Sequence, residues 1–142
     1  MSHAFALYAA GLGVFEVPTM LLLLLRGDPL GKATPWFDRV APFERTSYAY
    51  MYLAVLALLA TSRFLAAYLP RHRLLQIHNA LVHALELPLF VSLLWLRQGP
   101  IPPLCYILVA FMVVNCGVFG FHAYMVVACR QFSDVTREKK SK

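Results

Sequence analysis

The sequence predicts an all-α fold: an integral membrane bundle of four transmembrane helices, arranged as two similar helical hairpins. Hydrophobic side chains make up 60% of the 142 residues, charged side chains make up only 14%, and the mean hydropathy is +0.62. An ordinary soluble domain is less apolar and more highly charged. Four separate stretches also reach the ~20 apolar residues that a spanning helix needs. We therefore expect little of the chain to lie outside the membrane.

The first predicted helix covers residues 4–25. No basic segment precedes it and no small-residue cleavage site follows it, so we expect a retained helix and not a signal peptide. Residues 26–46 are polar and rich in proline, and Thr34 followed by Pro35 is typical of the start of a helix. We expect a short interfacial segment here, with Trp36 at the level of the lipid headgroups.

The second and third predicted helices cover residues 47–69 and 74–96. The link that joins them, residues 70–73, is so short that the two helices must form an antiparallel hairpin. The fourth predicted helix covers residues 104–128, after a turn rich in glycine and proline at residues 99–103. Residues 1–128 are thus predicted to form one transmembrane domain, and residues 129–142 a basic polar tail.

Two of the predicted helices share a pattern. Glu16-Val-Pro18 in the first helix and Glu86-Leu-Pro88 in the third are each followed by an apolar run, and they lie 70 residues apart. Repetition at a fixed offset indicates an internal duplication. This repetition is the reason to expect two similar halves.

The basic residues are unequally distributed between the two ends of the predicted bundle. The end with both termini and the link at residues 70–73 has seven basic residues besides Arg63, and the opposite end has five. The positive-inside rule then favours both termini on the cytosolic or matrix side. The net charge of +6 is expected to meet anionic phospholipid such as cardiolipin, with Trp36, Arg71 and Arg73 as lipid contacts. No nucleic acid partner is expected, because no RNA-binding motif or soluble basic domain is present.

Six polar side chains fall inside the predicted spans. At 1.5 Å per residue, Glu16, Glu86 and Asn115 lie roughly 18–19 Å from the end that carries the termini, near the middle of the bilayer. Arg63 and His122 lie at about 9 Å by the same calculation, with His83 between the two levels. We expect an intramembrane polar cluster in two layers, formed by Glu16, Arg63, His83, Glu86, Asn115 and His122.

Two roles for this cluster are open. Charged groups in a bilayer are costly, so they are normally paired or they perform chemistry. In the first interpretation, Glu16 and Glu86 are protonated, or paired with Arg63, His83 or Asn115, and they fix the register of the helices. In the second, Glu86 and His83 form an acid/base pair or a proton relay. We favour the first interpretation, in which the protein is not an enzyme.

Candidate metal ligands also occur in the predicted spans. Metal ligation would need His78, His83, Glu86 and His122, but His78 and His83 are five residues apart and do not share a helix face well. The three cysteines show no CxxC spacing. We therefore expect no metal and no cofactor.

Part of the chain is similar to a known family. Arg45-Thr46 opens the second predicted helix, Arg63-Phe64 and residues 66–68 close it, and His83 and Glu86 follow on the third. Between residues 45 and 90 these positions resemble the four-helix sterol-synthesis scaffold family called ergosterol biosynthetic protein twenty-eight. His83 and Glu86 are three residues apart here and four apart in that family. The resemblance implies a non-enzymatic scaffold that holds other membrane proteins together.

The expected function is that of an accessory or scaffold subunit of a larger membrane protein complex. The favoured assembly is an energy-converting complex of the mitochondrial inner membrane, an ATP synthase or respiratory chain complex, because small helical subunits are frequent there. The first alternative is an endoplasmic reticulum scaffold that tethers sterol-biosynthesis enzymes, and Lys139 and Lys140 match the spacing of a di-lysine retrieval signal. The second is a small membrane enzyme or proton-coupled carrier that uses His83 and Glu86.

Overall fold

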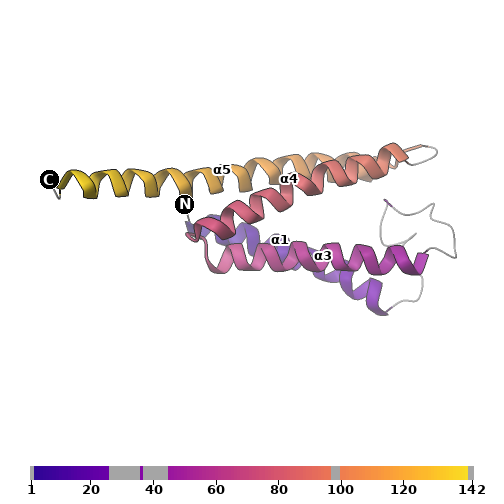
Figure 1. Cartoon of the computed structure of the whole chain (residues 1–142). Coiled ribbons are helices and arrows are strands. Elements are labelled where there is room, and N and C mark those ends of the chain that lie inside the picture. The colour runs from indigo at the N-terminus through magenta and orange to yellow at the C-terminus, as the bar shows by residue number, and fades with distance from the viewer. Residues whose placement is uncertain (1, 26–35, 37–44, 97–99, 141–142) are drawn as a thin grey trace.

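The computed structural model describes residues 2–25, 36, 45–96 and 100–140, and in these ranges it contains four α-helices and no strand (Figure 1). The helices are α1 (Ser2–Leu25), α3 (Arg45–Tyr68), α4 (Arg73–Leu96) and α5 (Pro103–Lys140). Each contains a segment of at least 23 residues that is apolar enough to cross a membrane. The prediction of an all-α, multi-pass membrane bundle is confirmed. Apart from Trp36 and the first residues of α3, the interfacial segment expected at residues 26–46 lies outside the described residues.

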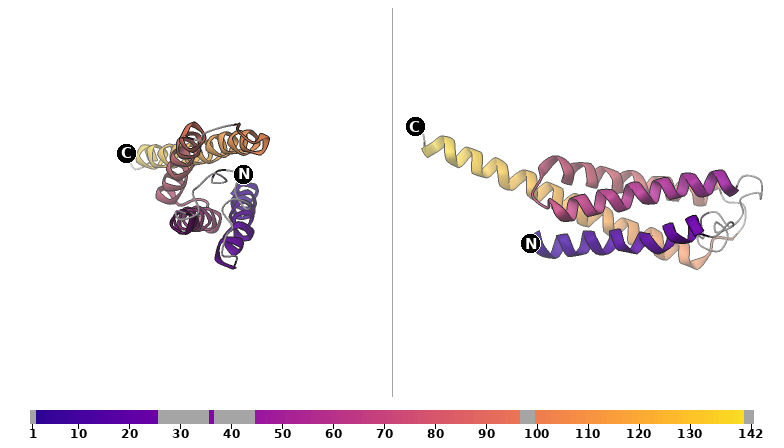
Figure 2. Two further views of the ribbon diagram at one scale, coloured as in Figure 1. Left: turned by 90° about the vertical axis from the view of Figure 1, so that its right-hand side faces the viewer. Right: turned by 90° about the horizontal axis from the view of Figure 1, so that it is seen from below.

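The helices pack as two pairs. α1 packs along α3 and α4 packs along α5, while a smaller contact between α3 and α4 joins the pairs. Seen along the bundle, the four helices surround a common axis (Figure 2). α1 and α4 carry the repeated Glu-x-Pro pattern, and each therefore contributes one carboxylate and one proline from the middle of its span.

The α3–α4 link forms the expected antiparallel hairpin. Nε2 of Gln76 on α4 donates to the carbonyl oxygens of Ala66 and Leu69 at the end of α3, at 3.1 and 3.0 Å. The last carbonyls of a helix lack an intrahelical N–H partner, so this side chain caps α3. At the start of α4, Nδ1 of His72 accepts the backbone N–H of Leu75 at 3.3 Å. The two helix ends are therefore fixed to each other by side chains of α4 and its link.

Two apolar clusters fill the bundle, one toward each end. The cluster toward the end with the termini consists of Phe5, Ala9, Leu12, Ala66 and Phe119. The cluster toward the opposite end consists of Leu23, Trp36, Tyr52, Leu56, Phe90, Cys105 and Met112. Glu16 on α1, Arg63 on α3 and Asn115 on α5 each lie between members of these two clusters in the sequence, whereas His122 lies beyond Phe119. The bundle therefore has a polar middle layer enclosed by apolar packing.

The close approach of α1 and α3 depends on Gly13. A Cβ atom at this position would lie 3.0 Å from two ring carbons of Phe64, which is closer than packed side chains normally come. At Gly11 a Cβ atom would meet nothing within 4 Å. Of the two glycines in this part of α1, only Gly13 is required for the helix contact.

The fourth helix is longer than the sequence predicts. It was expected to end near residue 128, but α5 continues to Lys140 and projects beyond the other three helices (Figures 1 and 2). Residues 129–140 contain neither proline nor glycine, so nothing in their backbone chemistry ends the helix. The polar tail is thus a continuation of α5 up to residue 140.

Candidate functional site

Arg63 on α3 lies at the centre of the polar layer, with only 2% of its surface exposed. Its guanidinium reaches carboxylates on two other helices. Nη1 donates to Oε1 of Glu16 on α1, and Nη2 lies 3.4 and 3.5 Å from the two carboxylate oxygens of Glu86 on α4. Nη1 also lies 3.5 Å from the backbone carbonyl oxygen of Leu12. One side chain thus connects three of the four helices.

His83 and Glu86 lie one turn apart on α4, and Nδ1 of His83 is 2.7 Å from Oε2 of Glu86. The other ring nitrogen, Nε2, lies 3.5 Å from Nε of Arg63, which carries a hydrogen and can only donate. A neutral imidazole with its hydrogen on Nδ1 satisfies both contacts, because Nδ1–H faces the carboxylate and the Nε2 lone pair faces the guanidinium. The geometry is therefore satisfied by the neutral Nδ1–H form of His83.

Glu16, Arg63, His83 and Glu86 form what we call the charge cluster. It contains two carboxylates and one guanidinium, and with a neutral His83 one negative charge has no matching cation among the four side chains. Unpaired charge is costly away from water. The cluster is therefore neutral only when it also holds one proton or one cation.

The other two candidate residues of the polar layer make separate contacts. The hydroxyl of Tyr8 on α1 donates to Oδ1 of Asn115 on α5 at 2.5 Å. Nε2 of His122 lies 2.9 Å from the carbonyl oxygen of Pro70 in the α3–α4 link, and its ring stacks on Phe5 with centroids 3.5 Å apart. In the described part of the chain, neither residue forms a hydrogen bond with Arg63. These two contacts hold α5 to α1 and to the link.

Sequence reasoning did not find four further polar residues that the structure uses. Tyr8 and Gln76 are described above, and the hydroxyl of Ser62 on α3 donates to Oδ1 of Asn79 on α4 at 2.7 Å. Asn79 is fully buried, and its Nδ2 has no hydrogen-bond partner among the described residues. Uncharged polar side chains do not stand out in an apolar run. Spacing is the sequence feature that could have identified two of them. Polar residues recur at three- and four-residue intervals on one face of α4, at Gln76, Asn79, His83 and Glu86.

Of the three predicted lipid contacts, two are exposed in the structure and one is buried. Arg71 and Arg73 are exposed at the α3–α4 link. The expectation that Trp36 contacts lipid headgroups is wrong, because this side chain is only 7% exposed and its ring centroid lies 4.8 Å from that of Phe90. Packing against Phe90 buries the large apolar surface of the indole inside the bundle. Trp36 is a core residue.

A cavity of about 230 Å³ reaches the charge cluster from the side of the apolar cluster around Trp36. Its polar lining residues include Glu16, Thr19, Arg63, Glu86 and Asn115, and aromatic side chains from α1, α3, α4 and α5 form much of its wall. His83 does not line it. The cavity therefore presents both carboxylates, but not the imidazole, to anything that occupies it.

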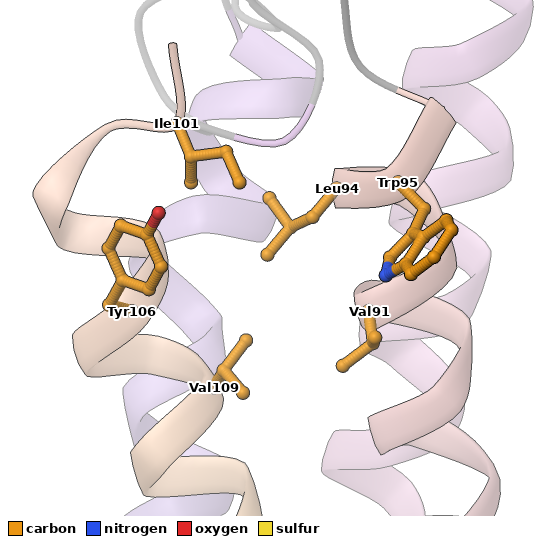
Figure 3. A pocket seen from close by; sticks show the side chains of 6 residues that line it. All are labelled: Val91, Leu94, Trp95, Ile101, Tyr106 and Val109. Carbon is orange, nitrogen blue, oxygen red and sulfur yellow. The ribbon is translucent and has the colours of Figure 1, made fainter.

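A second, apolar groove of about 420 Å³ lies between α4 and α5 (Figure 3). Its wall carries no charged side chain, and Trp95, at its edge, is 88% exposed. An apolar groove at this place on a membrane helix pair is chemically suited to hydrocarbon chains and not to polar ligands. It is lined by Val91, Leu94, Trp95, Ile101, Tyr106 and Val109.

No group of three or more His, Cys, Asp or Glu side chains that could hold a metal ion occurs in the described part of the chain. His78 is exposed on α4 and lies outside the charge cluster. Comparison with known proteins gives no match: no family model, no curated protein and no solved structure matches the chain. The resemblance to the sterol-synthesis scaffold family stays a prediction.

Proposed function

We propose that this protein is a non-enzymatic accessory or scaffold subunit of a larger membrane protein complex. The observation that carries the proposal is the set of contacts of Arg63, which binds Glu16 on α1 and Glu86 on α4 from its own position on α3. The charged groups inside the membrane are thus engaged in holding helices to one another. A buried network of this kind fixes helix register and orientation.

The outer surface of the bundle supports the same proposal. Every helix exposes large apolar side chains, and much of this surface is aromatic, including Phe15 on α1, Tyr50 on α3, Trp95 on α4 and Phe121 on α5. In a membrane such surfaces contact lipid tails or pack against partner helices. A small chain whose interior charges pair with one another and whose outer surface is apolar is suited to packing between larger subunits.

Lipid is the second partner that we propose. Arg71 and Arg73 are exposed at the end of the bundle where the α3–α4 link lies, whereas the apolar groove in Figure 3 lies at the opposite end and is a separate candidate site for hydrocarbon chains. Basic side chains beside a membrane span attract anionic headgroups. We propose that an anionic phospholipid such as cardiolipin binds at the link.

The compartment follows from the proposed partners. We propose the mitochondrial inner membrane, with an ATP synthase or respiratory chain complex as the host. The endoplasmic reticulum, with sterol-biosynthesis enzymes as partners, is the alternative, and it rests on the sequence resemblance and on Lys139 and Lys140. Deleting residues 139–142 is expected to redistribute the protein only in the second case.

The experiment that tests the proposal is extraction of the tagged native protein in mild detergent, followed by native-gel sizing and identification of the comigrating proteins. Comigration with a megadalton energy-converting complex is expected. Comigration with sterol-biosynthesis enzymes would favour the alternative compartment. Recovery only as a monomer or a small homo-oligomer would overturn the scaffold proposal.

Site-specific photocrosslinking locates the partner surface. A photoreactive amino acid is placed at one exposed position on each helix: Leu7, Leu58, Leu85 and Val114, which are 71%, 57%, 70% and 55% exposed. At least one position is expected to crosslink to another protein and the others to lipid. Leu56, which is 2% exposed, is the matched negative control. Lipid adducts at all four positions would argue against partner helices.

A catalytic role has one observation in its favour, the 2.7 Å contact of His83 with Glu86, which also lines the cavity. The variant Glu86→Gln separates the two functions. If Glu86 is a structural carboxyl that is already protonated, or if Glu16 alone suffices to pair with Arg63, an amide at position 86 preserves the helix contacts and assembly into the complex is expected to persist. An acid/base carboxyl does not tolerate it, because an amide cannot exchange a proton. A variant that assembles normally but loses the cellular function of the complex would favour chemistry at Glu86.

A further inference from the structure

Among the residues that line the cavity at the charge cluster, some on α1 and α5 are also exposed on the outer surface of the bundle. Contacts between these two helices, Tyr8 with Asn115 and Phe5 with Phe119 and His122, involve the half of α1 near the termini. In the other half, Phe15 on α1 and Phe111 on α5 line the cavity while remaining 62% and 41% exposed. Side chains that line a cavity and also face outward form its rim. A molecule in the membrane can therefore reach the carboxylates without crossing the packed interior.

The inner end of the cavity has an acceptor that the protein does not use. Glu16 lines the cavity, and among the described residues only its Oε1 receives a hydrogen bond, from Arg63. With His83 in its neutral form, the charge cluster also has one carboxylate charge more than it has cations. Both the open oxygen and the unmatched charge favour an occupant that donates hydrogen bonds and is positively charged.

The wall of the cavity suits the same kind of occupant. Phe15, Trp36, Tyr52, Phe90 and Phe111 all line it, and the rings of Trp36 and Phe90 lie next to each other with centroids 4.8 Å apart. Aromatic faces attract cations, and the attraction is stronger when water is excluded. Aromatic walls around a carboxylate bind an organic ammonium ion better than they bind an anion or a hydrated metal ion.

We propose that this cavity binds a lipophilic ammonium ion, with the ammonium group at Glu16 and the apolar body along the aromatic wall. The cavity of about 230 Å³ holds roughly eight groups the size of a water molecule, at ~30 Å³ each. This is enough for an amine with a short arm or a single ring, and a longer apolar body extends past Phe15 and Phe111 at the rim. The site does not depend on the identity of any protein partner.

The test compares two probes of equal size that differ in charge: 2-phenylethylammonium and 2-phenylethanol. Affinities are measured by calorimetry on the full chain in phosphatidylcholine nanodiscs at about pH 8, where an alkyl amine with a pKa near ~10 is charged. Empty nanodiscs give the background. The ammonium ion is expected to bind at least about tenfold more tightly than the alcohol, because only the ion interacts with the unmatched carboxylate.

Three variants assign the binding to this cavity. Glu16→Gln removes the surplus charge and is expected to reduce the preference for the ammonium ion to less than about threefold. Glu138→Gln makes the same change of charge in residues 129–142 and is expected to leave the preference unchanged. Thr19→Phe fills the cavity without altering its charges and is expected to abolish binding of both probes, which keeps the test decisive if Glu16→Gln does not fold.

Four results would overturn the proposal. One is equal affinity of the unchanged protein for the two probes, which would make the site a general apolar cavity. The second is a failure of both probes to bind, which would indicate that a proton neutralises the charge cluster. The third is a preference for the ammonium ion that survives in Glu16→Gln, and the fourth is binding that survives in Thr19→Phe. The last two would place the bound ion elsewhere.

Discussion

Nδ1 of His83 lies 2.7 Å from Oε2 of Glu86, one turn further along the same helix, while its Nε2 faces Arg63 on a neighbouring helix. The imidazole thus links the carboxylate to the guanidinium from one side, and its ring stacks on Phe119 of α5 with centroids 4.1 Å apart. Side chains of α3, α4 and α5 meet at this one residue. Its position explains why the polar layer holds the bundle together.

The first prediction concerns Arg63. Replacing it by methionine leaves the buried Glu86 and the partly buried Glu16 without a cation, and removal of one partner from a buried ion pair destabilises a protein by about 3–5 kcal/mol. Arg63→Met is therefore expected to lower the free energy of unfolding by this amount. The measurement is equilibrium unfolding in mixed micelles with an increasing fraction of SDS.

Two further variants show whether the loss comes from unpaired charge. Arg71→Met removes an exposed arginine and is expected to change the free energy of unfolding by less than about 0.5 kcal/mol. Combining Arg63→Met with Glu16→Leu and Glu86→Leu removes all three charges and is expected to recover most of the loss. No recovery in the triple variant would mean that packing of the arginine stem, and not charge, accounts for its effect.

The second prediction concerns the coupling of His83 and Glu86. His83→Phe keeps an aromatic ring against Phe119 but removes both nitrogen contacts, and Glu86→Leu removes the carboxylate. A double-mutant cycle of these two changes is expected to give a coupling energy of about 1–3 kcal/mol in the free energy of unfolding. The same cycle with the exposed His78→Phe in place of His83→Phe is expected to be additive within about 0.5 kcal/mol. Additivity in both cycles would show that the 2.7 Å contact contributes nothing to stability.

The third prediction concerns Gly13. A valine here forces its branched Cβ against the ring of Phe64, where even a single Cβ atom would lie at 3.0 Å. Overpacking of this kind destabilises by about 1–3 kcal/mol. Gly11→Val places the same side chain where nothing lies within 4 Å, so it controls for the helix propensity of valine. Equal unfolding free energies for the two variants would contradict the close packing of α1 on α3.

The fourth prediction concerns Gln76, which caps α3 from α4. Gln76→Leu leaves the carbonyl oxygens of Ala66 and Leu69 without their side-chain donor, and loss of a buried hydrogen-bond partner destabilises by about 1–3 kcal/mol. We also expect faster hydrogen exchange in the link at residues 69–73, measured by mass spectrometry. His78→Leu, on the exposed side of the same helix, is the control. Unchanged exchange in the link would show that Gln76 does not hold the hairpin closed.

The sequence by itself determined the membrane class, the number of helices and the residues that had to be buried. The physical reason is that a run of about 20 apolar residues has one stable environment, the bilayer, and a charge inside such a run is conspicuous. Glu16, Arg63, His83 and Glu86 were recognisable for this reason. The short link before Arg73 likewise determined the antiparallel hairpin, because a few residues cannot span the bundle.

Only the tertiary structure decided which groups meet. Helix rotation and packing bring Arg63 between Glu16 and Glu86, while Asn115 bonds to Tyr8 and His122 to the carbonyl oxygen of Pro70, although depth alone placed Asn115 beside the two glutamates. Depth along a span is a one-dimensional quantity, and it does not specify the direction in which a side chain points. The burial of Trp36 and the cavity at Glu16 could not be predicted from the sequence for the same reason. Both arise from side chains of different helices that converge in space.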